Sequence, residues 1–306
     1  MDELNNKWLH IEVSETGAEM CRILGLKSQT EYLWCADPAY WGQHCPLLFP
    51  LVGKLREGKT KIFGTTYEIP KHGFVSNEQF TKTAHTSNSL TYQLESTPAM
   101  HQVYPFPFRL EVNYKLRANH ITVSWTIYNI GLHRMSFHIG GHPGINYPNF
   151  DGKNKIKAYA RFKPEGSIES AAVCETGCLG NSRYTLPLME GLLPITDECF
   201  NNDAIIIDRN QVNSISLLDL NKNPYVTLDF ASPVLLLWSP HGVNSPFVCL
   251  EPWYGLCDAD DYEGDFANRP YTNHVEPGRS LTLGYTLHMD AEVSRAALSK
   301  KERGNS

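Results

Sequence analysis

Two consecutive runs of alternating apolar and polar residues near the middle of the chain constrain its fold most strongly. In residues 110–116 every second side chain is apolar, and residues 121–127 repeat the pattern after a loop around Asn119. Successive side chains of a β-strand point to opposite faces, so a period of two is typical of half-buried antiparallel strands. The apolar positions are Leu110, Val112, Tyr114 and Leu116, followed by Ile121, Val123, Trp125 and Ile127. The pattern predicts two consecutive strands of an antiparallel sheet.

Strand-like segments continue along almost the whole chain, and no long amphipathic helix or internal repeat interrupts them. The expected strands cover residues 8–13, 17–24, 30–34, 204–208, 214–218, 225–230, 234–238 and 280–289, together with a hairpin over 61–70 that turns at Gly64. Residues 45–55 are apolar but contain two prolines, which indicates a buried irregular segment or a sheet edge. The expected fold is all-β, with one large antiparallel domain, sandwich-like or barrel-like, over residues 1–290 and a polar tail over residues 291–306.

Charge and cysteine content narrow the class of protein further. The 306 residues carry a net charge of −6, which argues against nucleic acid or an anionic membrane as the main partner. No apolar run reaches the roughly 18 residues of a membrane span, and residues 1–13 lack the basic-then-apolar order of a signal peptide. The eight cysteines are scattered, so reduced thiols in the cytoplasm are expected. Cys174 and Cys178 are close, but no second pair accompanies them, so zinc is not expected there.

One carboxylate follows directly on an apolar, strand-like run. Glu251 comes after residues 247–250 and is followed at once by Pro252. Because proline cannot donate to a sheet ladder, the strand is expected to end or to reach an edge there. Glu251 would then lie at the mouth of a strand, where partial desolvation raises its basicity. Trp253 and Tyr254 offer flat, amphipathic surfaces beside it, which suit a sugar. The alternative is a salt-bridged residue at a strand end.

Several histidines are flanked by glycine. His142 stands between two glycines and Pro143, where the backbone can approach a ligand closely and the imidazole can exchange a proton near neutral pH. The alternative is a turn histidine bonded to nearby backbone. His138 lies four residues earlier, which on an extended strand is roughly 13 Å away and too far for one metal ion. His138 is therefore expected to be a supporting or core histidine, and His72 is expected in a loop ahead of a strand.

The remaining charged segments have simpler explanations. Five cations form a basic segment: Lys54, Arg56, Lys59, Lys61 and Lys71. Such a segment is usually a solvated face, although one cation could contact a hydroxyl or a phosphate. Residues 258–265 resemble a calcium loop only loosely, so an acidic surface loop is expected. The chain also lacks a phosphate loop, a nucleophile elbow and a metalloprotease motif. One carboxylate and several histidines on a β scaffold are typical of a proton-transfer enzyme without a cofactor or metal.

Five short motifs occur in order along the chain. They are Phe49-Pro50-Leu51-Val52-Gly53-Lys54-Leu55, His72-Gly73-Phe74, Gly140-Gly141-His142-Pro143, Asn202-Asp203-Ala204 and Cys249-Leu250-Glu251-Pro252-Trp253. This ordered set resembles the aldose 1-epimerase (galactose mutarotase) superfamily, most closely its bacterial branch of LacX-like proteins, and it covers most of the chain. The resemblance implies a large antiparallel β-sandwich, the supersandwich of the galactose mutarotase type.

The resemblance also implies an isomerase that interconverts the α and β anomers of an aldohexose without a cofactor. Glu251 matches the family's general base and His142 its general acid. His72 matches a histidine that contacts the substrate near the ring oxygen, and Asp203 matches an acid that binds sugar hydroxyls. Lys54 stands where the galactose enzymes carry an arginine, which keeps the charge but loses the planar fork. The expected partner is a small sugar, bound by a monomer or a homodimer.

A second difference from the galactose enzymes, and three alternative functions, mean that the sequence does not identify the substrate. Pro252 and Trp253 differ from the galactose enzymes but suit the LacX-like branch, and Trp253 is expected to stack on the sugar or to close the pocket wall. The basic segment around Lys54 suggests a phosphosugar (hexose-6-phosphate) mutarotase as an alternative. A non-catalytic carbohydrate-binding protein on the same fold is another. A glycoside hydrolase would need a second carboxylate, which Asp203 or Asp258 would have to supply.

Overall fold

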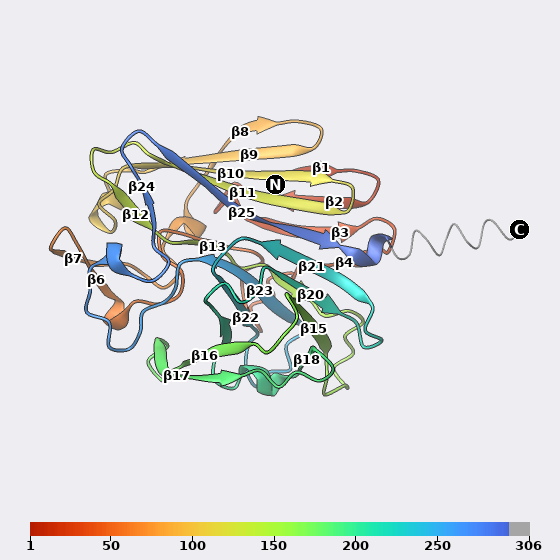
Figure 1. Ribbon diagram of the computed structural model, residues 1–306. Coiled ribbons are helices and arrows are strands. Elements are labelled where there is room, and N and C mark those ends of the chain that lie inside the picture. The colour runs from red at the N-terminus through yellow and green to blue at the C-terminus, as the bar shows by residue number, and fades with distance from the viewer. Residues whose placement is uncertain (294–306) are drawn as a thin grey trace, which may run out of the picture.

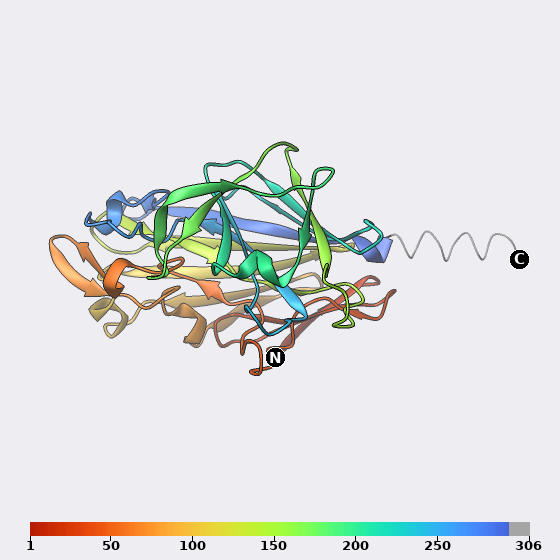
Figure 2. The same cartoon turned by 90° about the horizontal axis from the view of Figure 1, so that it is seen from below.

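The computed structural model describes residues 1–293, which form antiparallel β-sheets stacked in layers (Figures 1 and 2). The largest sheet has nine strands. In order across the sheet these are β18 (Leu192–Ile195), β15 (Ala158–Lys163), β20 (Ser214–Leu218), β21 (Pro224–Phe230), β25 (Ser280–Met289), β11 (His120–Asn129), β10 (Phe108–Arg117), β9 (Ser89–Glu95) and β8 (Thr81–His85). The two alternating runs form β10 and β11, which pair from Phe108 with Asn129 to Arg117 with His120. Buried side chains alternate with more exposed ones along both strands, so the prediction is confirmed.

A second sheet contains the strands that form the candidate site. In order across the sheet these are β17 (Leu179–Thr185), β16 (Glu169–Val173), β19 (Ala204–Ile207), β22 (Val234–Trp238), β23 (Phe247–Tyr254), β13 (Ile139–Gly141) and β5 (Leu47–Leu48). The short strand β14 (Gly144–Asn146) also pairs with β23. All eight residues of β23 are buried, so this strand is covered on both faces. The short β5 lies at the sheet edge, as expected for residues 45–55.

Smaller units complete the described fold. A third sheet consists of β1 (Asp2–Asn5), β2 (Leu9–Val13), β3 (Met20–Gly25) and β4 (Thr30–Glu31). Two strand pairs form separate ribbons: β6 (Lys59–Ile62) with β7 (Thr65–Glu68), and β12 (Met135–Phe137) with β24 (Asn273–Val275). Short 3-10 turns are η1 (Arg56–Gly58), η2 (Val75–Asn77), η3 (Met100–Gln102), η4 (Asp197–Phe200) and η5 (Phe266–Asn268). The β6–β7 ribbon is the expected hairpin and turns at Phe63 and Gly64, both with left-handed φ. The sequence pattern did not predict β1.

One apolar core joins the three sheets. Its members include Ile11 of β2, Val112 of β10, Leu228 of β21 and Leu250 of β23. Burial of apolar surface of this kind is the main driving force for folding. The expected antiparallel β-sandwich is confirmed. Among the described residues, no helix is both long enough and apolar enough to span a membrane. Of the expected polar tail, residues 294–306 lie outside the described part of the chain.

The expectation that Pro252 ends its strand is wrong. β23 continues to Tyr254 and pairs with β22, where Leu235 lies opposite Pro252. On the other side of β23, β13 pairs with residues 253–254 and β14 pairs with residues 247–249. The neighbouring strand is therefore interrupted opposite Pro252. A proline is tolerated in this central strand because no ladder bond is required at the interruption.

Candidate active site

A cavity of about 500 Å³ lies beside β23 and is lined by all six residues that the sequence singled out. They are Lys54, His72, His142, Asp203, Glu251 and Trp253. These residues come from segments far apart in the sequence, which the sheets bring together. A volume of this size suits a small molecule.

His142 and Glu251 meet at the interruption between β13 and β14. His142 lies in the short segment that joins these two strands. Its Nε2 is 3.1 Å from Oε1 of Glu251. The other carboxylate oxygen, Oε2, accepts a hydrogen bond from Nε1–H of Trp253 at 3.1 Å. Glu251 is 0% exposed and His142 is 8% exposed. An acid–base pair is therefore buried in the wall of the cavity.

Burial shifts the pKa values of this pair in opposite directions. It raises the pKa of Glu251 well above its usual value, although the hydrogen bond from Trp253 opposes the shift. It lowers the pKa of His142 well below its usual value, and the neighbouring His72 adds to that effect. If His142 and Glu251 together held two protons, the pair would be a buried cation, and if they held none it would be a buried anion. Both charged states are unfavourable in a buried site. The state with one proton on the pair is therefore favoured, and both pKa shifts favour the carboxyl group of Glu251 as its position.

His72 lines the same cavity in a defined neutral form. It lies in a turn with a left-handed φ of 66°. Its Nδ1 accepts a hydrogen bond from the backbone N–H of Gly53 at 3.1 Å. Burial, and to a smaller degree the charge of Lys71, lower the pKa of His72 to about 3. A neutral imidazole whose Nδ1 accepts carries its proton on Nε2. His72 can therefore donate one hydrogen bond from Nε2.

Aromatic rings surround the two histidines. Trp41 stacks on His142 with ring centroids 4.7 Å apart, and Trp238 contacts the same ring edge-on at 5.8 Å. Trp253 contacts His72 edge-on at 5.8 Å. Trp41 and Trp238 were not anticipated from the sequence. One lies in an irregular loop and the other ends a strand, so no spacing connects either of them to the site.

Two glycines allow β13 to lie close to the site. A Cβ atom on Gly140 would be 2.8 Å from Cδ1 of Trp253. A Cβ atom on Gly141 would be 2.8 Å from Cε1 of Tyr285. Both distances are well below the roughly 3.5–4.0 Å of a favourable carbon–carbon contact. Glycine is therefore required at both positions, directly before His142.

Comparison with known proteins identifies the family. A family model described as aldose 1-epimerase matches residues 3–261. The chain belongs to the aldose 1-epimerase family. Within the family, the chromosomal protein LacX of Lactococcus lactis subsp. lactis is 32% identical to this chain, over 93% of this chain and 98% of LacX. The resemblance carried by the five motifs is thereby confirmed.

Solved structures support the mutarotase-like fold for this member of the aldose 1-epimerase family. A galactose mutarotase related enzyme from Lactobacillus acidophilus is 31% identical, with a TM-score of 0.87 over 94% of this chain and 96% of that one. A galactose mutarotase-like protein from Lactobacillus casei is 23% identical, with a TM-score of 0.88 over 94% of this chain and 99% of that one. The stacked antiparallel sheets are therefore the fold of this family.

In this aldose 1-epimerase family member, the charged residues at the cavity differ in what already binds them. Nζ of Lys54 donates to the backbone oxygen of Thr176 at 2.6 Å, so its ammonium group holds the turn between β16 and β17. Asp203 is exposed and has a left-handed φ of 76°. Lys71 is also exposed, and its charge lowers the pKa of Glu251 while Asp203 raises it. Asp203 and Lys71 are thus positioned to act on a ligand in the cavity.

The middle of the basic segment lies away from the cavity. Arg56 forms an ion pair with Glu263 at 3.1 Å, and Lys59 forms one with Glu68 at 3.5 Å. Arg56 and Lys59 line a separate groove. The five cations expected to form one face are therefore divided between two places in the fold.

The expectation that residues 258–265 form an acidic surface loop is wrong at its first residue. Asp258 is 3% exposed and accepts hydrogen bonds from Arg269 at 2.6 Å (Nε) and 3.2 Å (Nη2). It also accepts the backbone N–H of Arg56 at 2.8 Å. A buried carboxylate requires such partners. Asp258 lies outside the cavity lining, so it does not provide a second carboxylate facing Glu251.

Proposed function

We propose that the protein is an aldose 1-epimerase (mutarotase) that interconverts the α and β anomers of an aldohexose. The observation that carries this proposal is the contact between Nε2 of His142 and Oε1 of Glu251 in the cavity wall. Anomer exchange requires one proton to leave the anomeric hydroxyl and another to reach the ring oxygen. A buried acid–base pair that shares one proton supplies both transfers, and the reaction needs no cofactor or metal.

The proposed reaction begins when the shared proton passes from Glu251 to His142 across their 3.1 Å contact, which the hydrogen bond from Trp253 to the ionised carboxylate assists. Glu251 removes the proton from the anomeric hydroxyl while His142 donates its proton to the ring oxygen, and the bond between C1 and the ring oxygen breaks. The pair then holds its single proton on Glu251. The open aldehyde rotates about its first carbon–carbon bond, and reclosure on the other face reverses both transfers. The net charge of the buried pair stays constant throughout, so burial does not oppose the reaction.

Other residues of the cavity are proposed to orient the sugar. The Nε2–H of His72 can donate to the sugar near its ring oxygen, and Asp203 can accept from hydroxyl groups. Trp41 and Trp238 line the cavity, where their aromatic rings can contact the apolar side of a pyranose ring. Trp253 acts mainly through its hydrogen bond to the carboxylate of the base. Lys54 acts indirectly, through the turn that it holds.

The direct test is anomer exchange, measured by NMR exchange spectroscopy or by polarimetry on freshly dissolved α anomers. We expect a small amount of protein to accelerate exchange of at least one free aldohexose. Sugar binding without acceleration would contradict the proposal and would favour a non-catalytic carbohydrate-binding protein. Release of sugar from an aryl glycoside would instead favour a glycoside hydrolase.

A hexose-6-phosphate mutarotase is the second candidate. The exposed ammonium group of Lys71 in the cavity lining favours it, because a phosphate attracts a cation. The same exchange experiment with 6-phosphates separates the two candidates. A clear preference for the free hexose would rule out the hexose-6-phosphate mutarotase.

We propose the cytoplasm as the compartment and a monomer or homodimer as the acting form. All eight cysteines fall within the described residues, and none of them is paired in a disulfide. Unpaired thiols are usual where the compartment is reducing.

Lys71→Met is expected to shift the pH–activity profile to higher pH. The charge of Lys71 lowers the pKa of Glu251 and of His142, so its removal raises both values. The acidic and basic limbs of the kcat/KM profile should then both move to higher pH. The shift should be less than about one pH unit, because solvent and salt screen an exposed charge. Polarimetry over a range of buffers measures the shift. The matched control is Lys59→Met, outside the cavity. A shift to lower pH, or an equal shift in the control, would contradict this assignment.

A further inference from the structure

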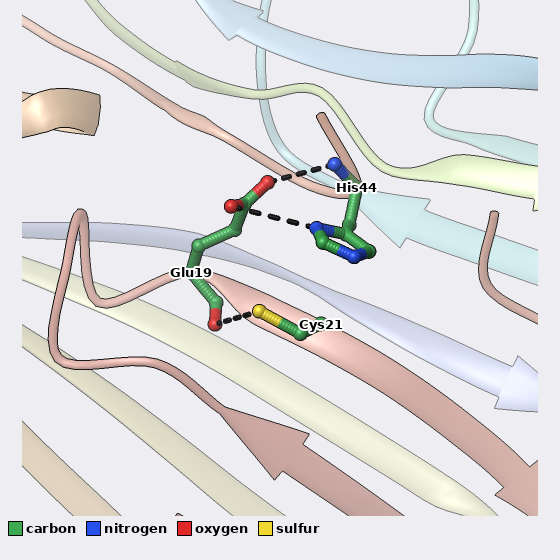
Figure 3. Close-up of side chains that lie close together, drawn as sticks. All are labelled: Glu19, Cys21 and His44. Atoms are coloured by element: carbon green, nitrogen blue, oxygen red, sulfur yellow. Dashed lines mark hydrogen bonds and ion pairs between the residues drawn. The ribbon is translucent and has the colours of Figure 1, made fainter. Parts of the chain in front are cut away.

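Figure 3 shows a second cluster of chemically reactive side chains, formed by Glu19, Cys21 and His44. Glu19 directly precedes β3, Cys21 lies in β3, and His44 comes from the loop before β5. One ligand atom from each side chain lies within 4.8 Å of the other two. None of the three residues lines the cavity described above. The cluster is therefore separate from the proposed acid–base pair.

A β-bulge explains the direction of the Cys21 side chain. Glu12 pairs with Arg22 and Val13 pairs with Met20, so Cys21 is an extra residue in the ladder between β2 and β3. A bulge re-aims the side chain that it inserts. Cys21 and Arg22 are both half-buried, whereas a regular strand would alternate between its two faces. The bulge thus explains why the sulfur lies beside the other two side chains in Figure 3.

Glu19 and His44 are held in place before any ligand binds. Oε1 of Glu19 accepts hydrogen bonds from the backbone N–H groups of His44 and Cys45, both at 2.8 Å. The other oxygen, Oε2, forms an ion pair with Nδ1 of His44 at 3.6 Å, a distance that is too long for a hydrogen bond. This Nδ1 atom is buried and has no hydrogen-bond partner among the described residues. A buried nitrogen that has an ion-pair contact but no hydrogen bond is incompletely satisfied, so a ligand bound there would be favourable.

The three donor atoms match one class of ligand. Carboxylate oxygen, thiolate sulfur and imidazole nitrogen are the donors that Zn²⁺ prefers, and ligand atoms around a tetrahedral Zn²⁺ lie roughly 3.3–3.8 Å apart. Small side-chain movements would bring the present atoms to that spacing. The side chains of Glu19 and His44 are 19% and 25% exposed, so an ion can enter from solvent.

We propose that Glu19, Cys21 and His44 bind a thiophilic divalent cation of the Zn²⁺ class through Oε2, Sγ and Nδ1. On binding, the thiol of Cys21 and the Nδ1 atom of His44 each release a proton to solvent, because the ligands are a thiolate and a neutral imidazole. Water occupies the fourth position of the tetrahedron. The ion links the start of β3 to the loop that carries Trp41, and so supports one wall of the cavity.

Titration with Co²⁺ tests this site in the full chain after treatment with a chelator. We expect a thiolate-to-cobalt charge-transfer band and tetrahedral d–d bands that saturate at one equivalent and disappear when Zn²⁺ displaces the cobalt. Cys21→Ser should lose the charge-transfer band. It should also weaken Co²⁺ binding by at least roughly 10-fold, because even outer-shell partners typically contribute 10–100-fold to metal affinity. Zn²⁺ should raise the melting temperature of the wild type but not of Cys21→Ser.

The matched control is Cys249→Ser. Cys249 lies with His142 and Glu251 in another group that could hold a metal ion. Replacing Cys249 therefore tests whether the cobalt binds at that group or at Glu19, Cys21 and His44. This control should retain the charge-transfer band. A band that persists in Cys21→Ser, a band lost in Cys249→Ser, or a wild type without any band would each overturn the proposal. Circular dichroism without metal checks the fold of each variant. If Cys21→Ser misfolds, His44→Ala provides the same loss of a ligand.

Discussion

Glu251→Gln is expected to slow catalysed anomer exchange by roughly 10²–10⁴-fold, the usual contribution of one positioned acid or base. The amide cannot take a proton from the anomeric hydroxyl. It has the shape of the carboxyl group, however, and its oxygen can still accept the hydrogen bond from Nε1 of Trp253. The fold should therefore persist, which circular dichroism and thermal melting would show. Polarimetry or NMR exchange measures the remaining rate.

Glu292→Gln is a matched control for the loss of a buried carboxylate. Glu292 is 0% exposed and accepts a hydrogen bond from the hydroxyl of Tyr32 at 2.9 Å, but it does not line the cavity. Its replacement should leave the rate per folded molecule unchanged. Full activity in Glu251→Gln would mean that another group is the base. Equal losses in both variants would indicate a general effect of removing a buried charge.

Arg269→Met is expected to destabilise the fold by about 3–5 kcal/mol, because it leaves a buried carboxylate without its charged partner. Arg269 is 5% exposed and makes two hydrogen bonds to Asp258. A third hydrogen bond, from Nη1 of Arg269 to the hydroxyl of Thr60, measures 2.7 Å. Methionine keeps most of the apolar volume but none of these bonds. Urea denaturation followed by circular dichroism measures the change in the free energy of unfolding.

Two further variants isolate the effect of the unpaired charge. In Asp258→Asn/Arg269→Met no charge remains unpaired, so the double variant should be more stable than Arg269→Met alone. Arg56→Met removes the ion pair with the exposed Glu263 and a long hydrogen bond of 3.5 Å to the backbone oxygen of Tyr262, and should change stability little. If Arg269→Met lost no more stability than Arg56→Met, the buried pair would not hold this part of the fold.

The parts of the fold that depend on local pattern could be predicted from the sequence. The alternation over residues 110–116 and 121–127 corresponds to β10 and β11, because a period of two is a property of each strand by itself. The hairpin over residues 61–70 was likewise visible, since its turn needs left-handed φ values and contains Gly64. Short motifs also predicted the family. The six candidate site residues that they contain all line one cavity.

Features that depend on distant strands could not be predicted. The local sequence around Pro252 predicts a strand end. Only the interruption between β13 and β14 makes a proline acceptable in this central strand. Asp258 reads as part of an acidic loop, because its partner Arg269 lies beyond a turn that pattern alone does not place. Trp41 reaches His142 through the path of an irregular loop, which leaves no periodic signal.

The two glycines of β13 restrict how substrate preference can diverge among relatives. A side chain at Gly140 or Gly141 would force Trp253 or Tyr285 to move, so substitution there would disturb the sheet that carries His142 and Glu251. Trp41, Lys71 and Asp203 instead lie outside the strands, where substitutions are tolerated more readily. If the proposed function holds, new sugar preferences would be expected to arise by substitution of Trp41, Lys71 or Asp203, without change to the His142–Glu251 pair.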